Sequence, residues 1–136
     1  MTALSADRMT PQRQRNVRSF PVKAAATIYA GGMAAIDATG NLVAASAVAA
    51  LKVVGRNERR VTNSGADGSI RADVKPGTFR WANSASTDLI TAADIGNDCY
   101  VVDDQTVAKT SNSNARPVAG TIYDVDSQGV WVTTKF

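Results

Sequence analysis

The alternation of apolar and polar residues along the chain predicts short β-strands. Residues 69–75 alternate most regularly, with Ile70, Ala72 and Val74 on one face and charged residues between them. Successive side chains of a strand point to opposite faces of the sheet. This segment is therefore expected to bury one face and to expose the other.

A tight turn and a second strand are predicted directly after this segment. Pro76-Gly77 favours a turn, and residues 78–82 then return with Phe79 and Trp81 on a shared face. Aromatic residues are only 6% of the chain. We therefore expect these rings to anchor the core or an interface, in preference to forming an exposed platform that stacks sugars or bases.

Two hairpins are predicted where a polar loop separates two apolar runs. The turn sequence at residues 37–41 lies between runs 33–37 and 42–44, and residues 103–106 separate a second pair of runs. A further extended stretch is expected around residues 51–61, with a break at Gly55. In the last predicted strand, Val130 and Val132 share one face.

One helical turn is predicted near residue 91. Thr91 is followed three residues later by Asp94, which resembles a capping box, and Gly96 ends the helix at once. The remaining pattern corresponds to about eight or nine short strands separated by turn residues. We therefore predict an all-β fold, a small barrel or sandwich of short antiparallel strands with one short helical turn.

The chain divides into a basic arm, residues 1–22, and a single β domain, residues 23–136. The arm is polar and contains two prolines, and its few apolar residues follow no period. Residues 1–23 carry five basic groups against one acidic group, a net charge of +4, whereas residues 24–136 carry ten against eleven, a net charge of −1. The net charge of +3 therefore belongs to the arm.

The composition argues against enzymatic chemistry. The chain has no histidine, which is the most common general base and metal ligand. Its single cysteine, Cys99, cannot form an intrachain disulfide, and its apolar neighbours predict a buried structural thiol. We therefore expect no enzyme and no cofactor. No apolar run approaches the roughly 20 residues of a membrane span, and we expect the chain to be made in the cytosol.

Four aspartates were considered as candidate ligands or acid–base groups. Asp103 and Asp104 are adjacent, and Asp124 and Asp126 lie two residues apart. Carboxylates so placed could bind a hard cation, but no calcium-loop spacing is present, and aspartate is a favoured turn residue. We predict that Asp103 and Asp104 form a turn, that Asp124 and Asp126 could share a strand face, and that no metal is bound.

The arm allows three interpretations. Its arginines could pair with a neighbouring protein subunit, neutralise nucleic-acid phosphates, or belong to a solvated tail. Because the arm lacks aromatic residues interleaved for base stacking, we favour protein contact. The residues that we predict to make this contact are Arg13, Arg15, Arg18 and Phe20.

Several short stretches of the sequence resemble those of a family of small phage head proteins. Proteins of this family are encoded near the major capsid protein in Mu-like and related transposable tailed phages. The stretches that carry the resemblance are 27–33 (TIYAGGM), 37–43 (DATGNLV), 92–104 (AADIGNDCYVVDD) and 117–122 (PVAGTI). The resemblance covers about residues 23–136 and does not include the arm.

This resemblance implies a capsid decoration, or cement, protein with a β-tulip or small-barrel fold. Such proteins commonly sit as trimers on the outside of an icosahedral shell, at three-fold and quasi-three-fold positions, and clamp neighbouring capsomers. The expected partner is the major capsid protein, and the expected location is the surface of the virion, after assembly in the host cytoplasm. The expected partners include neither a membrane nor directly bound nucleic acid, whereas DNA is the partner under the alternative of a small nucleic-acid-binding barrel.

Overall fold

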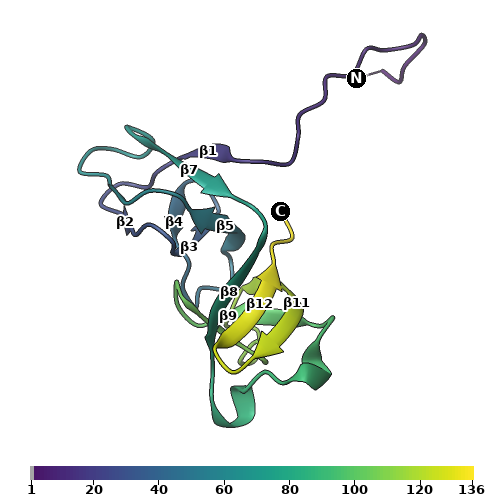
Figure 1. Ribbon diagram of the computed structural model, residues 1–136. Helices are drawn as coiled ribbons and strands as arrows, with labels where there is room; N and C mark the ends of the chain where they lie inside the picture. The colour runs from purple at the N-terminus through teal and green to yellow at the C-terminus, as the bar shows by residue number, and fades with distance from the viewer. Residues whose placement is uncertain (1) are drawn as a thin grey trace.

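Two groups of short strands, one above the other in Figure 1, make up the body of the protein. The computed structural model describes residues 2–136. The upper group is a five-stranded sheet in the order β1-β7-β5-β3-β4, and the lower group is a closed barrel in the order β10-β8-β12-β11-β9. Within the described residues, no helix has the length and the hydropathy to cross a membrane.

The strands are short, and most pairs are antiparallel. The sheet contains β1 (Arg18–Pro21), β3 (Met33–Ile36), β4 (Leu42–Ala44), β5 (Lys52–Asn57) and β7 (Arg71–Lys75). The barrel contains β8 (Thr78–Asn83), β9 (Asp98–Val101), β10 (Thr106–Ala108), β11 (Val118–Asp126) and β12 (Gly129–Thr133). The pair β2 (Thr27–Ile28) and β6 (Val61–Thr62) stands apart, and two 3₁₀ turns cover η1 (Ser86–Asp88) and η2 (Ala92–Asp94).

The five-stranded sheet curls until its two edges almost meet. After β1 the chain crosses to the opposite edge, where Val22 bridges Leu42 and the Lys23 N–H donates to the Leu42 carbonyl at 3.1 Å. The interior of this curl holds an apolar cluster that includes Ile28, Ala34 and Val74, each with 0% of its surface exposed. The bridge between Val22 and Leu42 thus closes the curl at one point of the two open sheet edges.

Strands β3 and β5 lie between two apolar cores. In β3, Ala34 packs into the core of the curled sheet, whereas Met33 and Ala35 pack into the core of the barrel. In β5, Val54 packs into the core of the curled sheet, whereas Val53 packs into the core of the barrel. Because the same two strands contribute to both cores, the sheet and the barrel are joined by buried apolar surface and not only by the connecting chain.

The alternation in the sequence correctly identified the buried faces. Ala72 and Val74 of β7 are buried, as are Val130 and Val132 of β12. The rings of Phe79 and Trp81 lie edge to face, with their centroids 6.3 Å apart, and both belong to the barrel core. These observations confirm the prediction that the two aromatic residues share a face; the rings anchor the core.

The two predicted hairpins are also present. Strands β3 and β4 pair across the turn at Asp37, and β9 pairs with β10 across residues 102–105. The Asp37 carboxylate accepts hydrogen bonds from the Thr39 hydroxyl and from the backbone N–H groups of Thr39 and Asn41. These bonds, the Thr39 hydroxyl first, lower the pKa of Asp37 to about 2.

The turn at Pro76-Gly77 does not form a hairpin. Strand β7 stays in the sheet, whereas β8 enters the barrel and pairs with β12 and, in parallel, with β10. The reason lies at the far end of the chain, where Thr134 exchanges three hydrogen bonds with the backbone of Gly77 at 2.7–2.9 Å. These bonds turn the chain toward the C-terminal strand, so the predicted return of residues 78–82 alongside β7 is wrong.

Gly55 does not break its strand, as the sequence suggested. It lies inside β5 with a φ of 147°, next to a register shift in the pairing of β3 with β5. A Cβ atom at this position would lie 2.3 Å from the Lys75 carbonyl oxygen. Glycine is required here because the paired strand passes too close for a side chain.

Other boundaries differ from the prediction in detail. Residues 2–136 form twelve strands and two 3₁₀ turns, where about eight or nine strands and one helical turn were expected. The predicted arm, 1–22, includes residue 1, which lies outside the described residues, and its last part belongs to the body: Arg18–Pro21 form β1 and Val22 is fully buried. Phe20 and Val22 give this segment a buried face, so the arm proper is residues 2–17. The all-β class with a small barrel is confirmed.

We expect Gly55→Ala to lower the free energy of unfolding by about 3 kcal/mol or more, because the new methyl group meets a backbone carbonyl in a left-handed conformation. Gly40→Ala is the matched control, since Gly40 also has a positive φ, 85°, but open space around it. It should cost about 1–2 kcal/mol. Urea unfolding of both variants measures the difference, and equal losses would contradict the assigned close approach.

Candidate partner-binding surface at the arm

The arm, residues 2–17, lies outside both groups of strands. Every one of these residues is exposed, and none belongs to a helix or a strand. Figure 1 shows the arm leaving β1 and extending away from the body. The backbone N–H and C=O groups of such a segment are free to pair with a partner, as in strand addition to an exposed sheet edge.

Arg15 holds the root of the arm, residues 13–18, where the arm joins β1. Its guanidinium donates to the carbonyl oxygen of Thr134 at 2.7 Å and to that of Phe136 at 3.3 Å. Thr134 is the residue that also fixes the turn between sheet and barrel. The direction in which the arm leaves the body is therefore tied to the C-terminal segment.

The structure separates the four predicted contact residues into two sets. Arg13 and Arg15 lie in the exposed arm. Arg18 and Phe20 belong to β1, where the Arg18 guanidinium lies 5.1 Å from the centre of the Phe20 ring and donates to the Val54 carbonyl at 3.4 Å. Phe20 packs against the core of the sheet. Arg18 and Phe20 therefore have partners within the chain, whereas Arg13 is free to reach another molecule.

Positive charge is concentrated at the root of the arm. The pKa of Arg18 lies below its usual value, because of partial burial and then because of the nearby charges of Arg15 and Arg13. The three guanidinium groups are therefore close enough to repel one another. Such a cluster favours an anionic partner, either carboxylates of a protein or phosphates.

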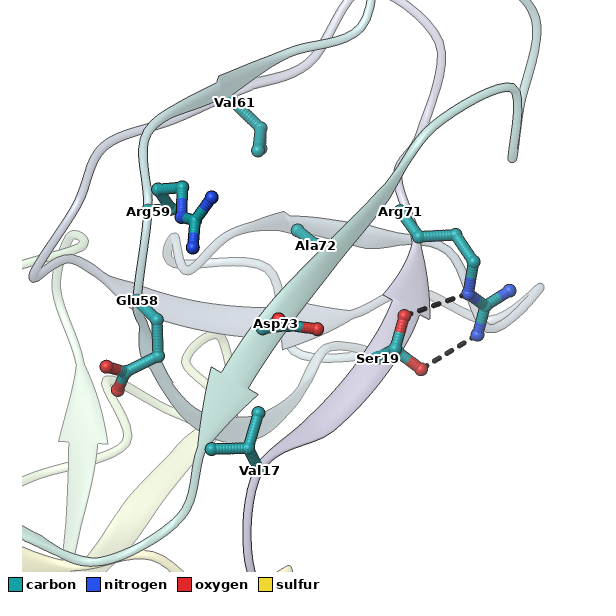
Figure 2. A pocket seen from close by; sticks show the side chains of 8 residues that line it. All are labelled: Val17, Ser19, Glu58, Arg59, Val61, Arg71, Ala72 and Asp73. Atoms are coloured by element: carbon teal, nitrogen blue, oxygen red, sulfur yellow. Dashed lines mark hydrogen bonds between the residues drawn. The ribbon is translucent and has the colours of Figure 1, made fainter.

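A hollow of about 290 Å³ opens beside the root of the arm. Figure 2 shows it between the segment that follows β5 and the strands β1 and β7. The residues that line it are Val17, Ser19, Glu58, Arg59, Val61, Arg71, Ala72 and Asp73.

The walls of this hollow are held by short polar contacts. Arg71 donates to the hydroxyl and the carbonyl oxygens of Ser19 at 2.9 and 2.8 Å, which ties β7 to β1. Glu58 is paired with Arg56 at 3.0 Å. The buried amide of Asn57 donates to the carbonyl of Arg59 at 2.8 Å and fixes the opposite wall.

A second hollow, of about 350 Å³, lies where the sheet meets the barrel. Its lining includes Tyr29, Gly31, Gly32 and Asp104. The Tyr29 ring is already covered on one side by Arg60, whose guanidinium lies 5.3 Å from the ring centre. One face of the Tyr29 ring is thus already covered, and the glycines offer no side chains to a partner. This hollow is therefore a weaker candidate for partner binding than the hollow beside the arm.

Asp103 and Asp104 lie in the turn between β9 and β10, whereas Asp124 and Asp126 lie in β11. Asp103 accepts from the Gln105 N–H at 2.9 Å, and Asp126 accepts from the Gln128 and Gly129 N–H groups and from the Trp131 indole. Residues 2–136 contain no group of three side chains placed to hold a metal ion. Cys99 is buried as predicted, and this burial, with the charge of Asp98 adding to it, raises its pKa to about 12.

Sequence reasoning missed the hollow. Its charged residues Glu58, Arg59, Arg71 and Asp73 read only as the solvated face of strands and loops. The alternation around residue 72 did place Arg71 and Asp73 together on the polar face. Their position beside the arm depends on the pairing of β1 with β7, for which the local pattern held no signal.

We expect Arg15→Gln to release both ends of the chain without unfolding the body, because it removes the hydrogen bonds to Thr134 and Phe136. Backbone order parameters of residues 13–17 and 135–136 should then fall below about 0.6. Arg13→Gln is the matched control, since Arg13 makes no hydrogen bond in the part of the chain that the structure describes. NMR relaxation measures both variants, and equal effects would contradict an anchoring role for Arg15.

The geometry at this surface consists of an exposed basic arm, a cluster of arginines at its root and a charged hollow beside it. Comparison with models of known families, with curated proteins and with solved structures found no match. Any function assigned to the chain therefore depends on the arm, its root and the hollow.

Proposed function

We propose that this chain is a structural decoration protein that binds the outer surface of an icosahedral phage head and stabilises the contacts between capsomers of the major capsid protein. The observation that carries the proposal is the exposed arm, residues 2–17, attached to a folded β body through β1 and Arg15. A long exposed segment on a folded body can reach across a boundary between subunits and tie them together.

The packing of the body and its contacts with the arm support this role. Two cores share β3 and β5, and the sheet curls onto itself at Val22 and Leu42. A load applied to the arm would pass through β1 into β7 and through Arg15 into the C-terminal segment. The first route ends in β7, where Ala72 and Val74 are buried, and the second ends at Thr134, which is buried and hydrogen-bonded to Gly77.

The arm carries the chemistry for a protein partner. Arg13 is exposed and makes no hydrogen bond or ion pair among the described residues, so it can pair with a carboxylate of the shell. Individual exposed pairs contribute little, about 0–1 kcal/mol each. Repetition by symmetry multiplies such contacts, and we propose homotrimers at the three-fold and quasi-three-fold positions of the shell.

The cluster of arginines at the root gives one specific observation in favour of nucleic-acid binding. The charges of Arg15 and Arg13 lie close enough to Arg18 to help lower its pKa, after partial burial, and such a group of positive charges could bind phosphates. Residues 2–17 contain no aromatic side chain for base stacking, and residues 24–136 carry a net charge of −1. These features favour the protein partner, and DNA binding is the alternative that the experiment must separate.

Sedimentation with empty shells that lack this protein tests the proposal. Full-length protein should pellet in stoichiometric amounts. A variant without residues 2–16, which keeps β1 intact, should bind about tenfold more weakly or worse. Arg13→Gln should weaken binding by a smaller factor. Lys52→Gln removes the same charge from an exposed position of the body and should leave binding unchanged.

The salt dependence of binding separates the two functions. If four arginines of the arm and its root neutralised phosphates, the logarithm of the DNA affinity would fall with the logarithm of salt concentration with a slope of about −3.6. Absence of shell binding together with such a slope would replace the decoration role with nucleic-acid binding.

A further inference from the structure

Two opposite charges face the hollow beside the arm without partners. Among the described residues, the guanidinium of Arg59 and the carboxylate of Asp73 make neither a hydrogen bond nor an ion pair, although most charged groups of the body do. Figure 2 shows Arg59 on the segment after β5 and Asp73 on β7, with space between them. The two walls of the hollow therefore carry opposite charges that face solvent without a protein partner.

The arm carries the complementary pair. Asp7 and Arg8 are adjacent and exposed, and neither has a polar partner in the part of the chain that is described. Side chains of neighbouring residues in an extended segment point in opposite directions. An extended segment lying between the two walls would thus direct Asp7 at one wall and Arg8 at the other.

We propose that this hollow binds the arm of a second copy of this chain. In this contact Arg8 of one copy pairs with Asp73 of the next, and Asp7 pairs with Arg59. The contact exchanges two sets of exposed charges for two ion pairs, and the polar lining accommodates the extended backbone.

Apolar residues on both sides add to the fit. The arm carries Leu4 and Met9, which are 75% and 96% exposed, on either side of the charged pair. The hollow offers Val17, which is 46% exposed, and Val61 in its lining. Burial of these side chains against one another removes apolar surface from water and places the arm along the hollow.

The arm of a second copy can enter the hollow more easily than the chain's own arm. Val17 lines the hollow and is also the last residue of the arm, so the arm leaves from the site itself. Arg15 then binds the C-terminal segment, and Figure 1 shows the arm continuing away from the body. An extended segment from residue 17 to residue 8 reaches about 30 Å, which is enough to enter a neighbouring copy.

Such a contact is heterologous, since the arm of each copy enters the hollow of the next. Heterologous contacts form closed rings when the rotation between copies closes, and open chains when it does not. A ring of three would be the trimer of the decoration role. The contact itself does not depend on that role, and it is tested with free protein in the absence of shells.

Disulfide trapping between variants that each carry one added cysteine tests the contact. Arg8→Cys protein labelled with ¹⁵N is mixed with unlabelled Asp73→Cys protein and oxidised, and peptides that join positions 8 and 73 are identified by mass spectrometry. The native Cys99 is buried with a raised pKa and stays out of the reaction. Asp124→Cys replaces Asp73→Cys in the control, because Asp124 is also an exposed carboxylate on a strand.

We expect linked peptides between labelled and unlabelled chains in at least about tenfold excess over the control, because docking raises the effective concentration of the two thiols. A yield no greater than that of the control would overturn the proposal. The doubly substituted chain, Arg8→Cys with Asp73→Cys, tests whether the arm instead enters the hollow of its own chain. Links found only within one chain would show that it does, and would equally overturn the proposal.

Charge reversal gives a second measurement that does not depend on cysteine. Arg8→Asp and Asp73→Arg should each reduce the weight-average mass in light scattering, and the two substitutions together should restore it. Both positions are exposed, so the variants should remain folded, which circular dichroism verifies. Failure of the double variant to recover would contradict the assigned pairing of Arg8 with Asp73.

Discussion

The burial of β3 and β5 between two apolar cores is the constraint on which the rest of the structure depends. Met33, Ala35 and Val53 pack into the barrel, while Ala34 and Val54 pack into the curled sheet. Neither core contains many large side chains, so each depends on the surface that these two strands supply. This shared burial joins sheet and barrel, and it gives the arm a stable base.

The base determines where the arm begins and what lies beside it. Strand β1 adds to β7, the chain continues through the buried Val22, and Arg15 binds the C-terminal segment. The same pairing of β1 with β7 places Asp73 opposite Ser19 and forms one wall of the charged hollow. A basic arm and a charged site without a protein partner thus arise from one edge of one sheet.

Local features could be predicted from the sequence, and distant contacts could not. The alternation around Ala72, the hairpin at Asp37 and the turn capped by Asp94 depend on neighbouring residues, and all three are present. The course of the chain after Gly77 depends on Thr134, 57 residues away, and the anchoring of Arg15 depends on a partner 119 residues away. Arg18 and Phe20 were expected to contact a partner for the same reason, since only the fold gives them neighbours within the chain.

The most direct test of the account is hydrogen exchange of the arm in free and in shell-bound protein. The account states that the arm makes the contact with the shell, whereas the body provides the base. Amides of residues 2–17 should therefore exchange rapidly in free protein diluted until it is monomeric, and become protected by about tenfold or more on shells, while protection of the barrel strands stays unchanged. Bound protein whose arm still exchanges rapidly would contradict the account, because the contact would then lie on the body.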